Sequence, residues 1–259
     1  MMVGSPPGGS PMDLAGSTVL VTGASSGIGR ETAILLSSLN ARLVLNGRNR
    51  ERLEETRSLL SGQDHRIEPF DLACSEEVPP WFRSWIPNTG PLHGLVHAAG
   101  IQSTLPIRFA KHAGAQHLLR TNLESAIMLA HAFCQRNCHA PDSSIVFLSS
   151  IMGLAGKAGM SVYGASKAAL IGFAKSLAME LAPDRIRVNC VAPGCVQTEM
   201  LGVMREFFSP EQFQALEKAH PLGFGAPRDV ANAIAFLLAD TGRWITGTVL
   251  VVDGGYSAQ

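Results

Sequence analysis

The sequence predicts an α/β fold: a single doubly wound domain with a parallel sheet of about seven strands and helices on both faces. Two observations indicate this class. Short apolar runs alternate along the chain with longer segments of helical period, as in repeated strand–helix–strand units. A glycine-rich turn, residues 22–29, joins the first apolar run directly to the first helical segment. At 259 residues the chain is long enough to bury one such core.

We assign residues 13–259 to this one domain. Residues 1–12 read MMVGSPPGGSPM, have no apolar period and are rich in Gly, Pro and Ser. This composition is typical of flexible segments, so we expect a disordered tail there. No internal repeat or linker divides the remaining chain.

Each predicted strand is a short run rich in Val, Ile and Leu, as expected where both faces of a parallel strand are buried. The runs lie at residues 17–21, 42–45, 66–70, 92–96, 144–148, 187–191 and 248–252. Between them we expect helices at 30–40, from about 49, at 113–137, 163–182 and 227–239. Segment 78–91 is rich in Pro and Trp and predicts a short or broken helix. Segment 195–225 predicts a loop and a helix that cover an apolar pocket.

The composition excludes several partner classes. Lys plus Arg and Asp plus Glu balance at 21 each, so the chain has no net positive charge that would attract nucleic acid. No apolar run approaches the length of a membrane span, and the N-terminus lacks the pattern of a signal peptide. The five cysteines are an odd, scattered set, which suits a reducing compartment. We therefore expect a cytoplasmic protein that binds neither nucleic acid nor membrane.

The glycine-rich turn predicts a dinucleotide site. Gly23, Gly27 and Gly29 follow a strand and open a helix, so the backbone can approach a pyrophosphate at the helix N-terminus. Many turns use glycine without binding a ligand, and the spacing here is GxxxGxG rather than GxGxxG. The strand before it and the helix after it favour a Rossmann-like cofactor site.

The end of the second strand predicts the kind of cofactor. An acidic residue in this region binds the ribose 2′-hydroxyl of NAD, whereas an arginine accommodates the 2′-phosphate of NADP. Here Gly47 and Arg48 occupy the region, and Glu51 comes too late. A solvated loop charge is the alternative interpretation of Arg48. The missing acid and the present base together favour NADP(H) over NAD(H).

Tyr163 and Lys167 are the candidate proton-transfer pair. Four residues apart on a helix, they lie one turn apart on one face. A cation about 4 Å from a phenol favours the phenolate by roughly 4 kcal/mol, so we expect a lowered tyrosine pKa. Ser150 follows the 144–148 strand, at the sheet edge where ligands bind in open parallel sheets. The spacing alone also fits an interfacial tyrosine beside a solvated lysine.

Taken together, these motifs resemble the short-chain dehydrogenase/reductase family over about residues 14–256. The order and spacing of the residues carry the resemblance, which is nearest to the 3-oxoacyl-acyl-carrier-protein reductases. The matching positions are Thr22–Gly29, Asp71, Asn122, Ser150, Tyr163, Lys167, Pro193-Gly194 and Asp253-Gly254-Gly255.

The resemblance implies four catalytic residues. Tyr163 would donate a proton to the substrate carbonyl while NADPH delivers hydride, and Ser150, rather than its neighbour Ser149, would hydrogen-bond the carbonyl oxygen. Lys167 would hold the nicotinamide ribose and lower the pKa of Tyr163. Asn122 would kink its helix and hold a water. The implied cofactor-binding residues are Gly23, Ser25, Ser26, Gly27, Ile28, Gly29, Arg48, Asp71, Leu72, Ala99, Gly100, Tyr163, Lys167, Pro193, Gly194, Val196 and Thr198.

The sequence departs from the family pattern in two places. His97-Ala98 stands where the family often has Asn-Asn, and we expect His97 to be a structural hydrogen-bonding residue. The relatives dock an acyl-carrier protein through basic residues, but 138–142 and 176–180 lack the expected arginines. This absence argues against carrier-protein docking. The family's subunit packing implies a homotetramer or a dimer.

The predicted function is NADPH-dependent reduction of a ketone, a 3-oxoacyl group or a related small carbonyl compound. The expected pocket is apolar, with Met152, Leu154, Met160 and segment 200–208. An NAD(P)-dependent alcohol, sugar or steroid dehydrogenase working in the oxidative direction is the main alternative. A sugar-nucleotide epimerase or dehydratase would carry a longer C-terminal domain, and a non-enzymatic NADP(H) sensor would lack the Tyr-Lys pair or the serine.

A metal site is a further alternative. His131, Cys134 and Cys138 have the spacing of one helix face, with His139 next in sequence. Neither a carboxylate nor a second cluster completes a set of four ligands. We therefore expect no metal and interpret the face as a subunit interface with small, soft side chains.

Overall fold

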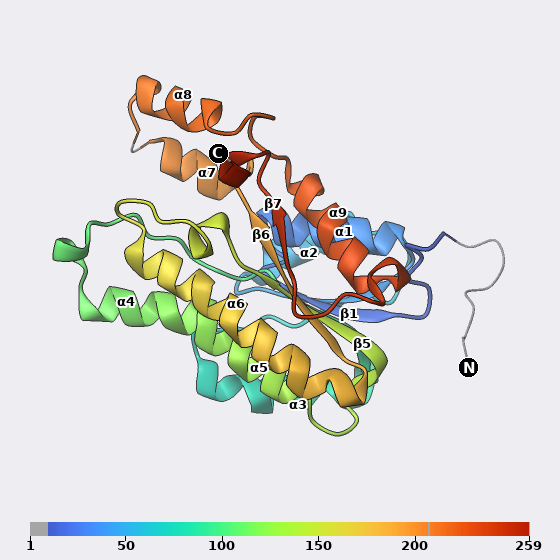
Figure 1. Ribbon diagram of the computed structural model, residues 1–259. Coiled ribbons are helices and arrows are strands. Elements are labelled where there is room, and N and C mark those ends of the chain that lie inside the picture. The colour runs from blue at the N-terminus through green and yellow to red at the C-terminus, as the bar shows by residue number, and fades with distance from the viewer. Residues whose placement is uncertain (1–9, 207, 259) are drawn as a thin grey trace.

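The computed structural model describes residues 10–206 and 208–258. Seven parallel strands form one sheet in the order β3-β2-β1-β4-β5-β6-β7 (Figure 1). The chain starts in the middle of the sheet, moves to one edge, and then crosses to build the other half. The doubly wound α/β prediction is confirmed. The strands are β1 (Thr18–Thr22), β2 (Arg42–Asn46), β3 (Arg66–Ile67), β4 (Leu92–His97), β5 (His139–Leu148), β6 (Arg187–Pro193) and β7 (Val249–Val252).

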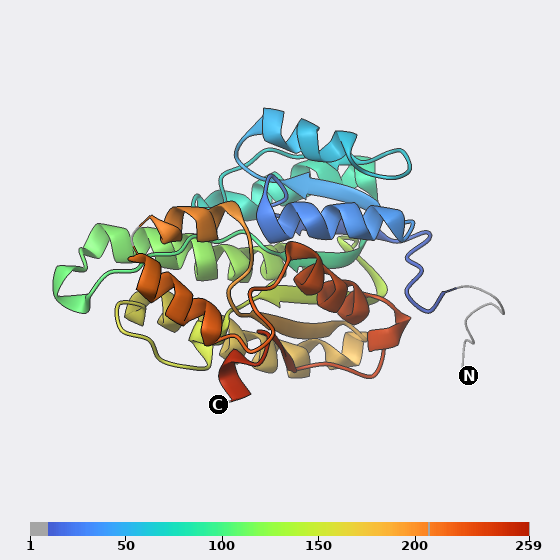
Figure 2. The same ribbon diagram turned by 90° about the horizontal axis from the view of Figure 1, so that it is seen from above.

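Helices cover both faces of the sheet. One face carries α1, α2 and α9, and the opposite face carries α3, α4, α5 and α6 (Figures 1 and 2). α7 and α8 follow the carboxyl end of β6 and lie beyond that end of the sheet (Figure 1). The helices are α1 (Gly27–Ser38), α2 (Arg50–Ser58), α3 (Val78–Thr89), α4 (His112–Leu119), α5 (Ser125–Phe133), α6 (Ser161–Leu181), α7 (Glu199–Arg205), α8 (Pro210–Lys218) and α9 (Pro227–Leu238).

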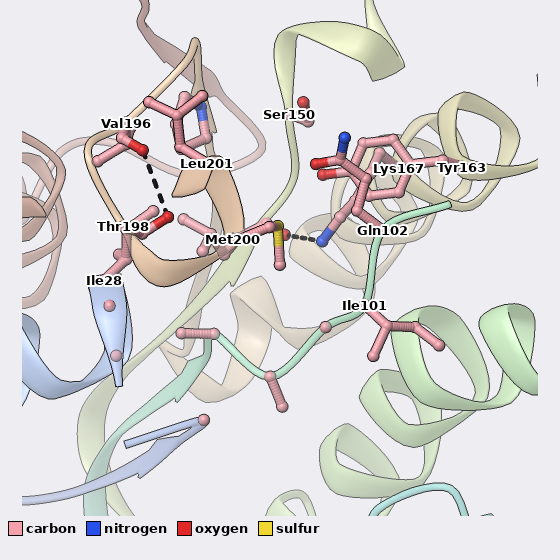
Figure 3. Close-up of a pocket in the computed structure, with 18 of the residues that line it drawn as sticks. Ile28, Ile101, Gln102, Ser150, Tyr163, Lys167, Val196, Thr198, Met200 and Leu201 are labelled. Carbon is pink, nitrogen blue, oxygen red and sulfur yellow. Dashed lines mark hydrogen bonds between the residues drawn. The ribbon is translucent and has the colours of Figure 1, made fainter. Parts of the chain in front are cut away.

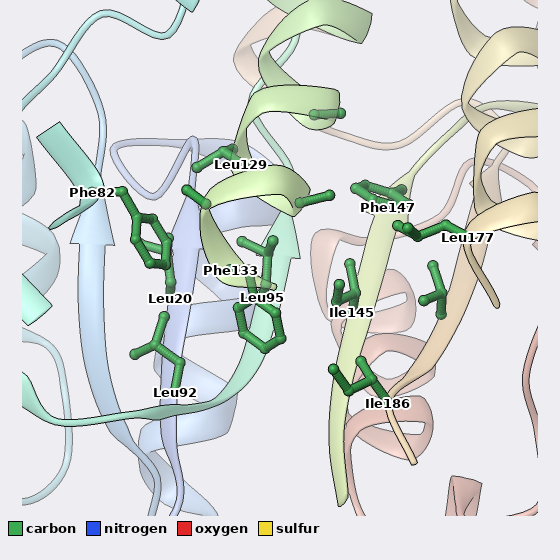
Figure 4. Packing of buried hydrophobic residues seen from close by; sticks show 14 of the residues in the cluster. Leu20, Phe82, Leu92, Leu95, Leu129, Phe133, Ile145, Phe147, Leu177 and Ile186 are labelled. Carbon is green, nitrogen blue, oxygen red and sulfur yellow. The ribbon is translucent and has the colours of Figure 1, made fainter. Parts of the chain in front are cut away.

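Two hydrophobic clusters hold these layers together, one on each face of the sheet. Alternate residues of a strand point to opposite faces, so Leu20 packs in the cluster below α3, α5 and α6. Val19 and Val21 pack in the cluster below α1 and α9. Figure 4 shows Phe82, Leu95 and other side chains of the first cluster between helices and sheet. The rigid sheet therefore fixes the positions of all the strand ends.

Three predicted helical segments differ in the structure. Segment 78–91, predicted as a short or broken helix, forms the continuous 12-residue helix α3. Pro79 and Pro80 lie in its first turn, where no N–H is needed, and Pro87 lies inside the helix near its C-terminal end. The predicted helix 113–137 is divided by a π-helical turn, Arg120–Glu124, and ends at Phe133. Segment 195–225 contains two helices, α7 and α8, instead of one.

The edges of the domain also differ from expectation. The predicted strand 66–70 pairs only over Arg66–Ile67. Residues 1–9 of the predicted tail lie outside the described residues. Met12 packs against the second cluster, beside the buried Leu14, so the ordered chain begins before residue 13. Within the described ranges, no helix combines the length and the apolar character needed to cross a bilayer.

Candidate active site

One pocket opens at the carboxyl ends of the strands. The β1–α1 turn forms one end, and the loops after β4 and β5 form its floor. Figure 3 shows Tyr163 and Lys167 of α6 on one side and Met200 and Leu201 of α7 across from them. The pocket is therefore bounded by segments that are far apart in sequence, and we refer to residues 199–206 and 208–218, which include α7 and α8, as its lid.

The β1–α1 turn forms a cradle made of backbone. Gly23 has φ +65°, and a Cβ at Gly29 would lie 2.3 Å from the Gly23 carbonyl oxygen, so no larger residue fits there. The side chain of Ser26, the N-cap residue of α1, makes no capping hydrogen bond. The first N–H groups of α1 are therefore available to an anionic group such as a pyrophosphate. This arrangement fits the dinucleotide predicted from the turn.

Arg48 lies at the far end of the same pocket. It follows β2 directly, and Asn46 and Gly47 line the wall beside it. Asn46 is buried and donates hydrogen bonds to the carbonyls of Glu68 and Phe70, which holds the ends of β2 and β3 together. Arg48 is exposed, and no ion pair ties it to a carboxylate within the described chain.

The two serines after β5 have different surroundings. Ser149 is buried, and its Oγ donates to the Lys167 carbonyl oxygen at 2.8 Å, which ties β5 to α6. Ser150 lines the pocket, and its Oγ accepts a hydrogen bond from Met152 N–H at 3.2 Å. The Ser150 side chain is also near enough to Tyr163 to lower the pKa of that phenol, against the larger opposite effect of burial. Both serines line the pocket, but the Ser149 hydroxyl is bound to the Lys167 carbonyl, whereas the Ser150 side chain acts on Tyr163.

Tyr163 and Lys167 are both buried, and this changes their expected electrostatics. The Lys167 Nζ donates to the Leu148 carbonyl oxygen at 2.7 Å and lies 5.8 Å from the centroid of the Tyr163 ring. In the protein alone burial raises the pKa of Tyr163, while the Ser150 side chain acts in the opposite direction. Burial lowers the pKa of Lys167 to about 8. The predicted lowering of the Tyr163 pKa is therefore wrong for the protein alone, because desolvation of the buried phenol is the largest effect and raises that pKa.

Asn122 lies in the π-helical turn and connects three segments. Its Oδ1 accepts from Ile101 N–H at 2.8 Å, and its Nδ2 donates to the Ile101 carbonyl at 2.9 Å. The same Nδ2 donates to Ser166 Oγ at 3.1 Å, between Tyr163 and Lys167 on α6. A Cβ at Gly100 would lie 3.3 Å from both Asn122 Oδ1 and Lys167 Nζ. The predicted helix distortion at Asn122 is present, and the residue positions the loop and α6 relative to each other.

His97 joins the glycine-rich turn to this network. Its Nε2 lies 3.3 Å from Ser125 Oγ, which itself donates to the Thr121 carbonyl, so Nε2 carries the proton. Its Nδ1, 3.1 Å from Thr22 Oγ1, then accepts from that hydroxyl. Burial lowers the His97 pKa to about 3, and the charge of Lys167 adds to the effect. His97 is a neutral structural hydrogen-bonding residue, as expected.

His220 is a residue that supports the site and that the sequence did not indicate. Its Nδ1 donates to the Leu216 carbonyl of α8 at 2.8 Å, and its Nε2 accepts from Cys195 N–H at 3.1 Å. Its ring lies against Phe224 and Tyr256. His220 thus holds the turn after β6 to the lid and to the C-terminal segment. A single histidine after a helix carries no sequence pattern that could reveal this role.

The substrate side of the pocket is largely apolar. Met152, Met160 and Leu201 line it, as do Met200 and Phe208 of segment 200–208. The prediction that Leu154 lines the pocket was wrong, because Leu154 follows the 3-10 turn Ile151–Gly153, is half exposed and is not among the lining residues. Met204 and Phe207, also in the predicted segment, lie outside the described side chains. The prediction missed Phe70, Ile101, Gln102, Thr104, Lys157, Leu216 and Tyr256, which also line the pocket.

The proposed metal-ligand face does not form. α5 ends at Phe133, so Cys134 caps the helix and Cys138 lies beyond it, and the three residues share no helix face. The ring of His139 stacks on Phe133 at 5.9 Å. No group of three or more potential ligands occurs within the described residues.

Every predicted site residue except Asn122 lines the pocket, and Asn122 supports it from behind. Their individual roles remain predictions. The residues that line it are Gly23, Ser25, Ser26, Gly27, Ile28, Gly29, Arg48, Asp71, Leu72, Ala99, Gly100, Ser150, Tyr163, Lys167, Pro193, Gly194, Val196 and Thr198.

A backbone cradle that leads to buried serine, tyrosine and lysine side chains defines an oxidoreductase of the Rossmann class. Comparisons with known proteins agree. A sequence model described as "Enoyl-(Acyl carrier protein) reductase" matches residues 23–257. The chain is 39% identical over 237 residues to carbonyl reductase family member 4 of Danio rerio, covering 91% of this chain and 96% of that one. It is also 39% identical over 246 residues to 3-oxoacyl-[acyl-carrier-protein] reductase FabG of Rickettsia prowazekii, covering 94% and 98%.

A solved structure extends the similarity to three dimensions. A putative short-chain alcohol dehydrogenase from Sinorhizobium meliloti 1021 superimposes with a TM-score of 0.88 at 33% identity, covering 96% of this chain and 100% of the other. The chain therefore belongs to the short-chain dehydrogenase/reductase family. It is an oxidoreductase that acts on CH–OH or C=O groups, and the family implies a NAD(P) cofactor.

Proposed function

We propose that the protein is an NADPH-dependent reductase of ketone carbonyls, acting on a 3-oxoacyl group or a related small carbonyl compound. One observation carries the proposal: Ser150 and Tyr163 line the same pocket beside an apolar wall, and the Ser150 side chain is near enough to act on the pKa of the Tyr163 phenol. Two hydroxyls in this position can both bind one carbonyl oxygen.

The chain's own residues have separate tasks in this proposal. Ser150 donates a hydrogen bond to the carbonyl oxygen, where negative charge develops. Tyr163 transfers its proton to the same oxygen; its raised pKa keeps it protonated before the reaction. The charged Lys167 faces the cofactor side of the pocket and stabilises the tyrosinate that remains. The bound nicotinamide supplies the hydride.

The preference for NADPH rests on Arg48. Its exposed guanidinium has no carboxylate partner among the described residues, and the end of β2 carries no acid that could bind a 2′-hydroxyl. A 2′-phosphate would give this charge a partner and could accept a bidentate hydrogen bond.

The substrate is tested with a panel of carbonyl compounds. The purified protein is given NADPH and, separately, acetoacetyl-CoA, an acyl-carrier thioester and simple ketones, and NADPH consumption is followed by absorbance. We expect turnover of small carbonyl compounds with no dependence on the carrier protein. A strong preference for the carrier thioester would instead support docking. Tight NADPH binding with no turnover of any carbonyl compound would contradict the reductase proposal and favour a cofactor sensor.

We also propose that the chain assembles into a homotetramer or a dimer. Trp244 and Met179 are 95% and 74% exposed, which is unusual for large apolar side chains. β7 is an edge strand on which Val251 is exposed, and the described chain offers it no second neighbour. Light scattering on the purified protein measures the assembly, and a monomer at micromolar concentration would contradict the proposal.

A further inference from the structure

The substrate side of the pocket contains one charged side chain that the reductase proposal does not use. Its walls are built from Ile101, Met152, Met160 and Leu201, together with Phe208. Lys157 lines the same pocket. It belongs to the loop that leads from Ser150 to Tyr163, so its position is linked to that of both residues.

The ammonium group of Lys157 is directed toward the lid. Its Nζ lies 5.9 Å from the centroid of the Phe208 ring, within the range of a cation–π contact. The charge also acts on Cys195, whose pKa is raised by burial and lowered in part by Lys157. Cys195 in turn influences Tyr163. Lys157 therefore lies next to Phe208 and near enough to Cys195, which follows β6, for its charge to act there.

No carboxylate neutralises this charge within the described residues. The acids that line the pocket are Asp71 and Glu199. Asp71 accepts from the Ala73 N–H, and Glu199 is ion-paired with Arg52. The usual arrangement for such a lysine is an apolar stem on the surface with the ammonium group in water. Lys157 is likewise exposed, but its ammonium group lies beside Phe208 where both residues line the pocket, so it is accessible to an anionic group of a bound substrate.

We propose that Lys157 is a specificity residue that binds an anionic group of the substrate, a carboxylate or a phosphate carried on the same molecule as the ketone. This inference rests on the proposed reductase function. Lysine is a compact charge on a flexible stem, so it can bind either anion without fixed geometry. The charge plays no part in proton transfer, and neutral ketones would be reduced without it.

The test compares matched substrates that differ in charge. Acetoacetate is paired with ethyl acetoacetate, and acetoacetyl-CoA with its short neutral analogue, S-acetoacetyl-N-acetylcysteamine. In Lys157→Gln we expect kcat/KM to fall about tenfold or more for an anionic substrate, as for loss of a charged hydrogen bond, and to change less than about twofold for the neutral partners. Lys157→Arg keeps the charge and should retain most of the preference. A loss for acetoacetate alone identifies a carboxylate site, and a loss for the CoA thioester alone identifies a phosphate site.

Lys218→Gln is the matched control, because Lys218 is an exposed lysine of α8 that does not line the pocket. Equal losses for charged and neutral substrates, or no loss for any, would overturn the proposal. If the wild-type protein reduces none of the four compounds and none of the panel of carbonyl compounds described above, the reductase function fails. Calorimetric binding of acetoacetate and of acetoacetyl-CoA to the NADPH complex then decides the Lys157 proposal separately: weaker binding of either anion by Lys157→Gln supports it, and unchanged binding of both contradicts it.

Discussion

Replacing His97 with asparagine should make the fold less sensitive to acid. In the folded protein the His97 pKa is about 3, against an ordinary value of 6.5, because the ring is buried and lies near the charged Lys167. Between these two pH values the unfolded chain binds one more proton at this position than the folded chain. The free energy of unfolding therefore rises with pH across this window, and the contribution of His97 is lost as the pH falls below about 6.5.

The size of the effect follows from the difference in pKa. Each pH unit below 6.5 costs about 1.4 kcal/mol, so the loss is about 2 kcal/mol at pH 5 and approaches about 5 kcal/mol near pH 3. This is a large part of the 5–15 kcal/mol that stabilises a typical domain. Asparagine does not titrate, so His97→Asn should remove the contribution of His97 to the slope of the free energy of unfolding against pH. The stability of the His97→Asn variant at neutral pH should fall, because the edge-on contact between the His97 and Phe147 rings is lost.

Urea unfolding at a series of pH values between 4 and 7.5 measures the slope. His112→Asn is the control, because His112 is an exposed histidine at the start of α4. We expect the slope of His97→Asn to be shallower than that of the wild type by close to one proton, and the slope of the control to be unchanged. Parallel curves for His97→Asn and the wild type would refute the assignment of His97 as a neutral, buried member of the network.

Two further predictions concern the cofactor. Arg48→Ala should weaken NADPH binding about 10- to 100-fold and NADH binding less than about threefold, since a charged hydrogen bond to phosphate is lost. Fluorescence titration measures both dissociation constants, and Arg50→Ala is the control. Equal losses for both cofactors would refute the 2′-phosphate assignment. Because the Lys167 pKa is lowered to about 8 by burial, NADPH affinity should decrease as the pH rises through this value, by up to about tenfold per unit. The same titration from pH 6.5 to 9.5 should show no such decrease in Lys167→Met, and a wild-type affinity that stays constant above pH 8 would contradict the assignment.

The sequence predicted the order of the elements well because each strand is a compact apolar run and the glycine-rich turn has few alternatives. The same reasoning located the pocket residues, since parallel strands end at one edge of the sheet. The reasoning failed where the rule that proline breaks helices was applied without regard to where in the helix each proline lies. The prolines of α3 suggested a short or broken helix, yet Pro79 and Pro80 begin the helix, and the helix continues past Pro87 near its end.

Electrostatics was the least predictable part of the site. The spacing of Tyr163 and Lys167 suggested attraction, but spacing does not reveal how deeply the two groups are buried. In the structure burial dominates both pKa shifts. The role of His220 was likewise invisible, because its two backbone partners come from Leu216 and Cys195, which only the folded lid brings together.

Tyr163→Phe tests the central claim most directly, because it removes one hydroxyl and leaves the ring that packs in the pocket. Turnover of the best carbonyl substrate and the dissociation constant of NADPH are measured on the same preparation. If Tyr163 is the proton donor, kcat should fall at least about 100-fold while NADPH binding changes less than about threefold. A variant that binds NADPH normally and keeps more than a tenth of the wild-type kcat would contradict the account.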